Sequence, residues 1–519
     1  MKHLNQELIL IIDFGSQVTQ LIARRLRELN IYCEIKPYQT ININFFQKHK
    51  PNGIIFSGGP SSVTSSNFHK LPLNIFKLEI PILAICYGQQ LMAKMLGGQV
   101  INTETSSEFG KSFIFKKNNS PLIKGLFNKK KEQVWMSHGD IVSKIPKNFK
   151  IIASSDNSPN AIISDEKNCF YGVQFHPEVI HTINGKKILD NFANISKIKK
   201  SWKMGLYAES SILKIKSIVK DEKVICALSG GVDSAVTAIL IHKAINKNLT
   251  CIYVDHGLMR KKETEEIKKM FNDNFKIKLK IVNASKMFLT KLSKVKNPET
   301  KRKIIGKLFI KIFESEAKKI GGVKFLGQGT LYPDVIESVS AMGGPSVTIK
   351  SHHNVGGLPK KIKFKLIEPL RSLFKDEVRR LGKELEIPES FINRHPFPGP
   401  GLAIRCLGEI TRKKIKILRE VDHIFLSQIK KYNLYNEIWQ AFATILPVKS
   451  VGVMGDNRTY ENVCCLRAVT SIDGMTAETY HFQNDFLTET ATKIINEVKG
   501  VNRVTYDITS KPPGTIEWE

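Results

Sequence analysis

The chain has 519 residues, too long for one hydrophobic core and typical of about three folding units. Its 42% hydrophobic and 24% charged residues are close to the average for globular domains, which excludes a wholly disordered protein. Lysine and arginine exceed aspartate and glutamate by 79 − 48 = 31, but the lysines are spread along the sequence without interleaved aromatic residues. We therefore interpret the excess as a solvated surface suited to small anionic substrates, in preference to a nucleic-acid-binding surface.

The first apolar run, Leu8 to Ile12, stops at Asp13 and is far shorter than the roughly 20 residues that span a bilayer. No small-residue cleavage site follows it, so we expect a cytoplasmic protein without a membrane segment. The eight cysteines form no CxxC pair and have no metal-like spacing to histidine. Neither a disulfide framework nor a structural zinc site is therefore predicted.

The first 195 residues alternate short apolar runs with turn signals, the pattern of an open α/β sheet, and we predict a first domain over residues 1–200. The amphipathic stretch Val18–Leu29 predicts a helix between two of these runs. The predicted strands are Leu8–Ile12, Gly53–Ser57, Ile80–Ile85, Ile151–Ser154 and Phe170–Gln174. A lysine-rich stretch, Ser196–Lys203, then breaks the pattern and is interpreted as a linker.

A candidate nucleophile follows the third of these strands. The strand leads into Cys86 in a tight turn, and a helix is predicted over Gln89–Leu96, closed by Gly97 and Gly98. A strand–turn–helix elbow holds a nucleophile on a strained backbone, and the helix N-terminus favours a thiolate. A cysteine flanked by apolar residues is often only a core residue, so the elbow alone does not decide the case.

His176 and Glu178 supply the partners that a catalytic cysteine needs. They follow a buried strand and share one face of extended chain, because side chains alternate with a period of two. Glu178 can then hold the imidazole in the tautomer that accepts the thiol proton, as in nucleophilic triads. The sequence therefore predicts a Cys86–His176–Glu178 triad.

An oxyanion hole is predicted beside the thiol. Ser57-Gly58-Gly59-Pro60 follows another strand, and glycines leave room for a backbone N–H to face a developing oxyanion. We assign the hole to the amides of Gly59 and Tyr87. A plain strand-ending turn is the alternative interpretation of this segment.

The strand–loop–helix rhythm restarts after the linker and predicts a second α/β domain over residues 201–395. Its predicted elements are strands at Val224–Leu228, Thr250–Asp255 and Lys324–Gly327 and a helix over Ala235–Lys243. Near residue 395 the run PFPGPGLAIR, with three prolines and two glycines in eight residues, forbids regular structure. We place a second boundary there and predict a smaller α+β domain over residues 396–519.

The loop after the first of these strands is a predicted nucleotide site. Two glycines and two serines at a helix N-terminus form a cradle for an anion. The loop lacks the Gly-Lys-Ser/Thr that clamps a transferred γ-phosphate, so we predict that it holds an intact pyrophosphate and that ATP is cleaved between its α and β phosphates. Asp233 would help to position Mg²⁺. The predicted ATP-binding residues are Ser229, Gly230, Gly231, Val232, Asp233, Ser234 and Ala235.

Two later segments, Tyr332–Ser338 and Lys350–Pro359, concentrate acids, cations, glycines and prolines. A polar lid that keeps water from an activated intermediate fits this composition better than a zinc site at the two adjacent histidines.

Together with KPPGTIEWE at Lys511–Glu519, these motifs resemble the glutamine-hydrolysing GMP synthase family. Class I glutamine amidotransferases share the triad motifs and N-type ATP pyrophosphatases share the loop, whereas PFPGPGLAIR, SVGVMGD (Ser450–Asp456) and KPPGTIEWE resemble GMP synthases specifically. The resemblance implies that glutamine supplies ammonia at Cys86. It also implies that ATP adenylylates O2 of xanthosine 5′-monophosphate (XMP) and that ammonia displaces AMP to give GMP. A homodimer through the C-terminal domain is the family's expectation.

Further site residues follow from the same resemblance. It implies XMP contacts at Arg302, Lys511, Ile516 and Glu517. It places Asp334, Glu337, Lys350, His352 and His353 in the lid.

Three positions depart from the family's pattern. Ala84 replaces a glycine before the nucleophile and should still allow close packing. His256 replaces an asparagine near the expected adenine side, so nucleotide affinity could differ. Ala235 replaces a serine, which removes a hydroxyl but no backbone donor.

Two rival functions stay open. An enzyme with the same two motifs could aminate another purine or pyridine nucleotide, although the C-terminal motif favours XMP. The basic charge also permits a nucleic-acid-binding protein with decayed catalysis, for which the sequence carries no RNA-binding signature.

Overall fold

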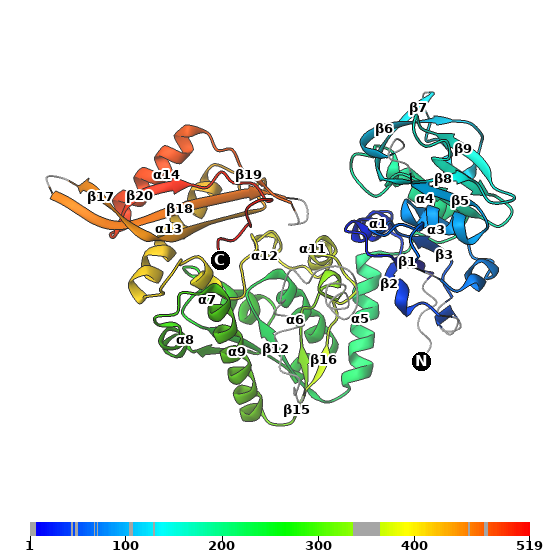
Figure 1. The fold of residues 1–519 in the computed structure, drawn as a ribbon. Coiled ribbons are helices and arrows are strands. Elements are labelled where there is room, and N and C mark those ends of the chain that lie inside the picture. Colours follow the sequence, from blue (N-terminus) through cyan, green and yellow to red (C-terminus); the bar gives the residue numbers. More distant parts are fainter. Residues whose placement is uncertain are drawn as a thin grey trace. The chain divides into compact units, whose positions relative to one another are not determined.

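The computed structural model describes residues 7–519 except 43–44, 47–49, 67, 70, 103–106, 128–129, 336–363, 455–456 and 472–475. The described residues form two compact units, 7–203 and 204–519 (Figure 1). Both units contain α/β sheets, and the second also contains a smaller sheet with antiparallel strands, so the predicted fold class is confirmed. In the part of the chain that is described, no helix is both long and apolar enough to cross a membrane.

The first unit is built on one sheet of nine described strands in the order β2-β1-β3-β4-β11-β10-β9-β6-β7. The parallel half consists of β1 (Ile9–Asp13), β2 (Cys33–Pro37), β3 (Gly53–Phe56), β4 (Ile82–Ile85) and β11 (Phe170–Val173). It contains four of the five predicted strands, whereas the predicted strand Ile151–Ser154 lies in the antiparallel half. β3 and β4 are fully apolar, because strands covered on both faces have no polar side. The antiparallel half consists of β10 (Ile162–Asp165), β9 (Lys150–Ser154), β6 (Glu108–Lys116) and β7 (Lys131–His138).

Among the described residues, three α-helices complete the first unit. They are α1 (Thr19–Glu28), α3 (Tyr87–Met95) and α4 (Gly185–Ile195). A separate pair, β5 (Gln99–Asn102) and β8 (Asp140–Lys144), contacts α3. Two of these helices, α1 and α3, pack on the strands, and α4 packs on α1.

The predicted linker is anchored to the first unit by one aromatic residue. Trp202 is only 4% exposed, its amide donates to the Asn30 carbonyl (2.9 Å), and its ring lies 4.1 Å from the Arg27 guanidinium. The lysines around it stay in water, as lysine-rich segments do. The first unit therefore ends at Lys203, directly before α5 (Met204–Val219).

The second unit begins with a parallel sheet of five described strands in the order β14-β13-β12-β15-β16. The strands are β12 (Lys223–Leu228), β13 (Leu249–Asp255), β14 (Leu279–Asn283), β15 (Val323–Gly327) and β16 (Lys365–Ile367). The helices are α6 (Val232–Ile245), α7 (Glu263–Lys268), α8 (Ser285–Leu292), α9 (Pro298–Ile320), α11 (Lys375–Glu384) and α12 (Glu389–Ile392). The predicted helix over Ala235–Lys243 is thus found within α6, which is buried nearly all round.

The C-terminal part of the second unit is α+β, as predicted. Strands β17 (Gln440–Met454) and β18 (Asn457–Thr470) form a long two-stranded arm, and β18 also pairs with β19 (Glu478–Thr479) and β20 (Val501–Tyr506) (Figure 1). Helices α13 (Arg412–Lys431) and α14 (Asn484–Glu497) pack on this sheet.

The segment PFPGPGLAIR corrects one expectation. It contains a single 3₁₀ turn, η6 (Gly401–Ile404), which begins directly after the last proline and is fully buried. The prolines do exclude an α-helix, but they leave room for one short turn. A single cluster of buried residues joins both sheets of this unit, from Ile225 in β12 to Val501 in β20. The boundary near residue 395 therefore stays a proposal.

Candidate active sites

Cys86 sits on a strained elbow between β4 and α3. Its φ is 51° and its ψ is −110°, a backbone conformation that few residues other than glycine adopt. Two close contacts fix the turn: the Cys86 amide donates to the Val173 carbonyl (2.7 Å), and a Cβ at Gly88 would lie 2.7 Å from the Phe56 Cβ. The thiol is thus held at the N-terminus of α3 with 6% of the residue exposed.

His176 and Glu178 lie beside this thiol. The His176 Nδ1 atom is 2.8 Å from Glu178 Oε1, and Glu178 is fully buried. Burial lowers the pKa of His176, but the charge of Glu178 and hydrogen bonds with Cys86 and Glu178 more than offset this, so the pKa lies well above its usual value. The arrangement favours a protonated imidazole at His176 beside the Cys86 sulfur.

One glutamine and a carbonyl contact the sulfur, a second glutamine contacts the first, and sequence reasoning missed all three. Gln174 Nε2 is 3.8 Å from Cys86 Sγ, and the Cys86 thiol donates to the Ser137 carbonyl (3.5 Å). Gln90 lies 3.5 Å from Gln174 and donates to the Asp140 carbonyl (2.8 Å). A buried glutamine in an apolar strand was the available signal, because buried polar groups need partners.

The two predicted oxyanion donors lie side by side. A Cβ at Gly59 would lie 3.3 Å from the Tyr87 ring and 2.9 Å from the Phe14 carbonyl, so only glycine fits there. Tyr87 is the first residue of α3, and its amide therefore has no acceptor within the helix. The assignment of the hole to Gly59 and Tyr87 stays a prediction that this geometry supports.

The predicted pyrophosphate loop joins β12 to α6 and is held by its own serines. Ser234 Oγ accepts from the Ser229 amide (3.2 Å) and donates to the Gly231 carbonyl (2.9 Å). Gly230 has a φ of 83°, and a Cβ there would lie 2.9 Å from Glu263 Oε1. The glycine is therefore required by both conformation and space.

Asp233 lies in the first turn of α6 with an oxygen left open. Its Oδ2 is 2.5 Å from the ammonium of Lys375, which the sequence analysis did not identify, and its Oδ1 is buried without a hydrogen-bond partner among the described residues. An open carboxylate oxygen beside an ammonium group suits a magnesium–pyrophosphate ligand, because Mg²⁺ takes one or two carboxylates plus phosphate oxygens. The residues present therefore fit the predicted ion.

The four residues predicted to contact XMP are all in the second unit but engage different partners. Arg302 donates to the main-chain oxygen of Glu519 (2.6 Å), and Glu517 is held by Arg405. Lys511 pairs with Ala477 through the backbone, and Ile516 is buried in a cluster that also contains Ala477. The C-terminal segment and the start of α9 thus meet in this unit.

Comparisons with known proteins match all three parts of the chain. Residues 10–195 match the class I glutamine amidotransferase family, residues 205–304 the PP-loop domain family and residues 427–518 the GMP synthase C-terminal domain family. The chain is 59% identical to GMP synthase (glutamine-hydrolyzing) of Dinoroseobacter shibae over 520 residues, which covers 100% of both chains. It is 60% identical to the enzyme of the same name from Ruegeria sp. and 59% identical to that of Brucella ovis, each covering 98% of both chains.

The chain belongs to the glutamine-hydrolysing GMP synthase family. The resemblance drawn from the sequence motifs is thereby confirmed.

The structure explains how two departures from the family's pattern fit. Ala84 is fully buried in β4, where it pairs with Gly172 on one side and Phe56 on the other, so the glycine opposite accommodates its methyl group. Ala235 is 2% exposed and its amide donates to the Gly231 carbonyl (3.2 Å). That amide is therefore used by the helix rather than presented to a ligand.

His256 is the third departure from the family's pattern. Its Nδ1 accepts from the Leu258 amide (3.1 Å), as an asparagine side-chain oxygen can in a turn. The ring is 2% exposed and packs against Phe288 and Phe309. Burial lowers the pKa of His256 to about 4.

Little of the predicted lid is described. Asp334 lies in a short helical turn, where its Oδ2 accepts from the Leu331 amide (2.9 Å). The other predicted lid residues, Glu337, Lys350, His352 and His353, lie outside the described residues.

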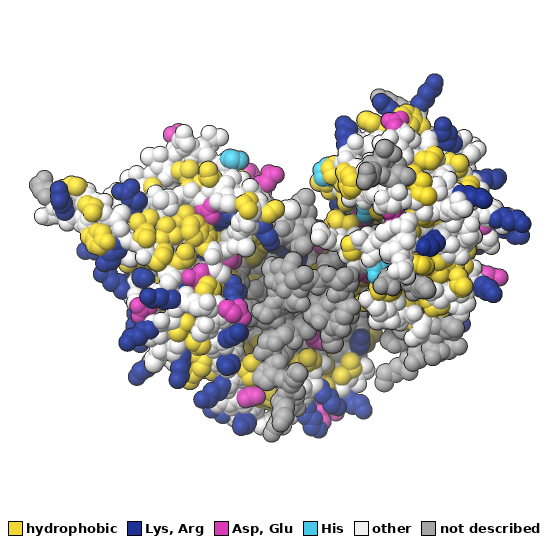
Figure 2. Space-filling view, viewed as in Figure 1, with side chains coloured by type: hydrophobic (Ala, Val, Ile, Leu, Met, Phe, Trp, Pro, Cys, Tyr) yellow, Lys and Arg dark blue, Asp and Glu magenta, His cyan; other side chains and the backbone are white. Residues whose placement is uncertain are grey.

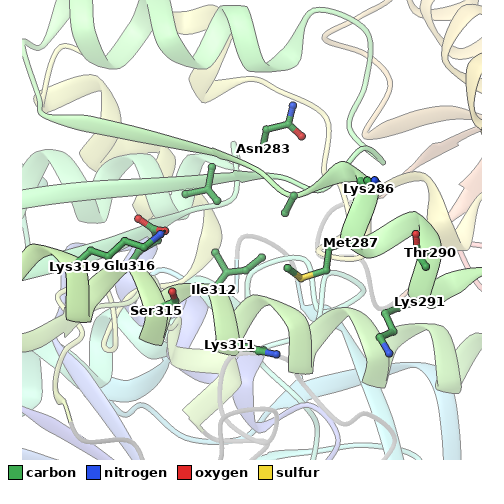
Figure 3. Close-up of a pocket in the computed structure, with 12 residues that line it drawn as sticks. Asn283, Lys286, Met287, Thr290, Lys291, Lys311, Ile312, Ser315, Glu316 and Lys319 are labelled. Carbon is green, nitrogen blue, oxygen red and sulfur yellow. The ribbon is translucent and has the colours of Figure 1, made fainter.

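A separate cavity of about 640 Å³ lies between β14, α8 and α9 (Figure 3). Apolar side chains such as Met287 and Ile312 face its centre, and Lys286, Lys291 and Lys311 line it. None of the residues predicted from the sequence lines this cavity.

Proposed function

We propose that the chain makes GMP from XMP, ATP and glutamine, releasing glutamate, AMP and pyrophosphate. The observation that carries this proposal is the presence, in one chain, of a buried cysteine triad and of a pyrophosphate loop with an open carboxylate. Each is the part that one half of such a reaction needs.

In the first half-reaction, Cys86 attacks the side-chain carboxamide of glutamine. His176 carries the thiol proton to the leaving ammonia, and the buried Glu178 stabilises the imidazolium. The amides of Gly59 and Tyr87 would hold the oxyanion of the tetrahedral intermediate. Water then hydrolyses the glutamyl thioester to glutamate.

In the second half-reaction, O2 of XMP attacks the α-phosphorus of ATP and pyrophosphate leaves. The loop amides and serine hydroxyls hold the departing pyrophosphate, and Lys375 adds a positive charge beside it. Mg²⁺, held by Asp233, would neutralise charge on the phosphates. Ammonia then attacks C2 of the adenylylated base, and AMP leaves.

The four residues near the C-terminal segment would bind XMP. Arg302 and Lys511 are cations suited to the phosphate, and Glu517 is an acceptor for a purine N–H. Ile516, whose side chain is buried, is the fourth predicted contact. An alternative nucleotide acceptor would leave the rest of the scheme unchanged. A panel of purine and pyridine nucleotides incubated with ATP and ammonia distinguishes the two, because only XMP should yield AMP.

The arm formed by β17 and β18 supports a homodimer through the C-terminal part. Val448, Val451, Val453 and Tyr460 on this arm are between 53% and 74% exposed, and Figure 2 shows hydrophobic side chains gathered over this region. Exposed apolar patches of this kind mark interaction surfaces. Analytical ultracentrifugation should show a dimer for the wild type and a monomer for the double variant Val451→Glu, Val453→Glu. A double variant that stays dimeric would contradict this surface.

A cytoplasmic location is part of the same proposal, supported by eight free thiols.

The direct test of two separate sites is Cys86→Ala. We expect it to abolish GMP formation from glutamine but to preserve GMP formation from ammonium at high pH. Cys169→Ala, which changes a partly exposed thiol elsewhere in the first unit, is the matched control. Loss of both activities in folded Cys86→Ala would contradict the proposal.

A further inference from the structure

A buried series of charged groups begins at the pyrophosphate loop. Arg394 Nη1 donates to the Gly230 carbonyl (3.1 Å), and its Nη2 lies 3.6 Å from Glu263 Oε1 and 2.9 Å from Glu266. Glu263 is 3% exposed, and a Cβ added at Gly230 would lie 2.9 Å from its Oε1 atom. The ion pair of Arg394 and Glu263 therefore contacts the backbone of the pyrophosphate loop.

The next link passes from α7 to α13. The second oxygen of Glu263 accepts from the Arg260 amide (3.2 Å), and the Arg260 Nε atom lies 3.1 Å from Asp422 Oδ2. Arg260 also donates to the Ala441 carbonyl (3.3 Å). Burial lowers the pKa of Arg260, but Asp422 and Glu263 more than offset this, so the guanidinium keeps its charge.

Asp422 connects this arginine to a second one. The carboxylate is 2% exposed; its Oδ1 accepts from the Ala443 amide (3.1 Å) and lies 4.0 Å from Arg405 Nη1. Arg405 is fully buried, and its guanidinium lies 5.2 Å from the centre of the Phe397 ring and 4.2 Å from that of Phe442. Its Nη1 has no hydrogen-bond partner among the described residues and is about 1 Å beyond hydrogen-bond distance of Asp422.

The series ends at Glu517. Arg405 holds both oxygens of this carboxylate, at 3.0 and 2.7 Å, and Gln440 donates to one of them (2.6 Å). A bidentate arginine fixes both the charge and the plane of a carboxylate. Glu517 is thus oriented by a side chain that itself has one open donor toward Asp422.

We propose that this series couples occupation of the pyrophosphate loop to binding of XMP, with Asp422 as its central positioning residue. The inference rests on the proposed roles of the loop and Glu517. Buried charges interact strongly because water does not screen them, and the open Arg405 donor allows two discrete arrangements, one with and one without a contact to Asp422. Filling the loop shifts Arg394 and Glu263, and the series transmits this to the plane of Glu517. The members in order are Arg394, Glu263, Arg260, Asp422, Arg405 and Glu517.

The test measures the affinity for XMP by calorimetry, with and without α,β-methylene-ATP and Mg²⁺. By thermodynamic linkage the ratio of the two dissociation constants is the coupling factor. We expect it to be about 10 in the wild type, within the range typical of allosteric coupling, and below about 3 in Asp422→Asn. Arg394→Gln removes the first member of the series at a partly exposed position and should lower the coupling factor by a similar amount. It replaces Asp422→Asn as the test if the Asp422→Asn protein does not fold.

Gln428→Met is the matched control, because Gln428 is a buried polar residue of α13 that bonds to Glu489 outside the series. It should keep the wild-type coupling factor. A purely structural role for Asp422 would weaken XMP binding equally with and without the ATP analogue. That result, or a wild-type ratio near one, overturns the inference. Failure of the wild type to bind XMP at all would instead overturn the proposed function.

Discussion

The buried neutral His256 should make the second unit sensitive to acid. Its pKa lies at about 4 in the folded chain and near 6.5 in the unfolded chain, because burial disfavours the charged ring. Between these values the unfolded chain binds a proton that the folded chain does not. The contribution of neutral His256 to the free energy of unfolding is therefore fully present above about pH 6.5 and is lost as the pH drops toward 4.

The size of this effect follows from the two pKa values. Protonation of the unfolded chain at about pH 4.5 should lower the free energy of unfolding by about 2.5 kcal/mol relative to about pH 7.5. His256→Asn preserves an acceptor for the Leu258 amide and removes the titrating ring. The variant also loses packing against Phe288 and Phe309, but this lowers the free energy of unfolding equally at both pH values.

The assay is urea unfolding of wild type and His256→Asn at both pH values. On going to the lower pH, the free energy of unfolding of wild type should fall by about 2.5 kcal/mol more than that of His256→Asn. His481→Asn, at an exposed histidine before α14, serves as the control. A pH-independent difference between wild type and His256→Asn would refute the reasoning.

Three further variants test separate parts of the account. Glu178→Gln removes the charge that raises the pKa of His176, so kcat/KM for glutamine should fall at least about 100-fold while ammonia-dependent activity stays; unchanged glutamine kinetics would contradict the triad. Gly230→Ala forces a side chain against Glu263, so ATP-dependent AMP formation should fall at least about 10-fold with the glutaminase intact, as checked by product assays. Trp202→Ala removes the buried ring that packs on Arg27, so the free energy of unfolding of the first unit, measured in urea, should fall by about 3 kcal/mol. A decrease below about 1 kcal/mol would show that Trp202 does not anchor the linker.

The parts of the fold that local sequence determines were predictable. The β4–Cys86–α3 elbow and the β12–loop–α6 unit are each encoded by a continuous apolar run, a turn and a helix. The lysine-containing strands β6 and β7 were not predicted, because β7 alternates buried and exposed residues, with Lys131 exposed and Glu132 buried.

Contacts between distant residues limited the prediction of the sites. Lys375 reaches Asp233 across 142 positions, and Arg405 reaches Glu517 across 112. Lys375 and Arg405 do not belong to the same motifs as their carboxylate partners, so no spacing rule in the sequence connects them. The anchoring of the linker by Trp202 was missed for the same reason, although a lone tryptophan among lysines was a signal.

The most direct test of the account is the identity of the nucleotide products. Purified protein supplied with XMP, ATP, glutamine and Mg²⁺ should form GMP and AMP in equal amounts, with pyrophosphate released. Formation of ADP and phosphate in place of AMP would contradict the central claim that the loop after β12 holds a departing pyrophosphate.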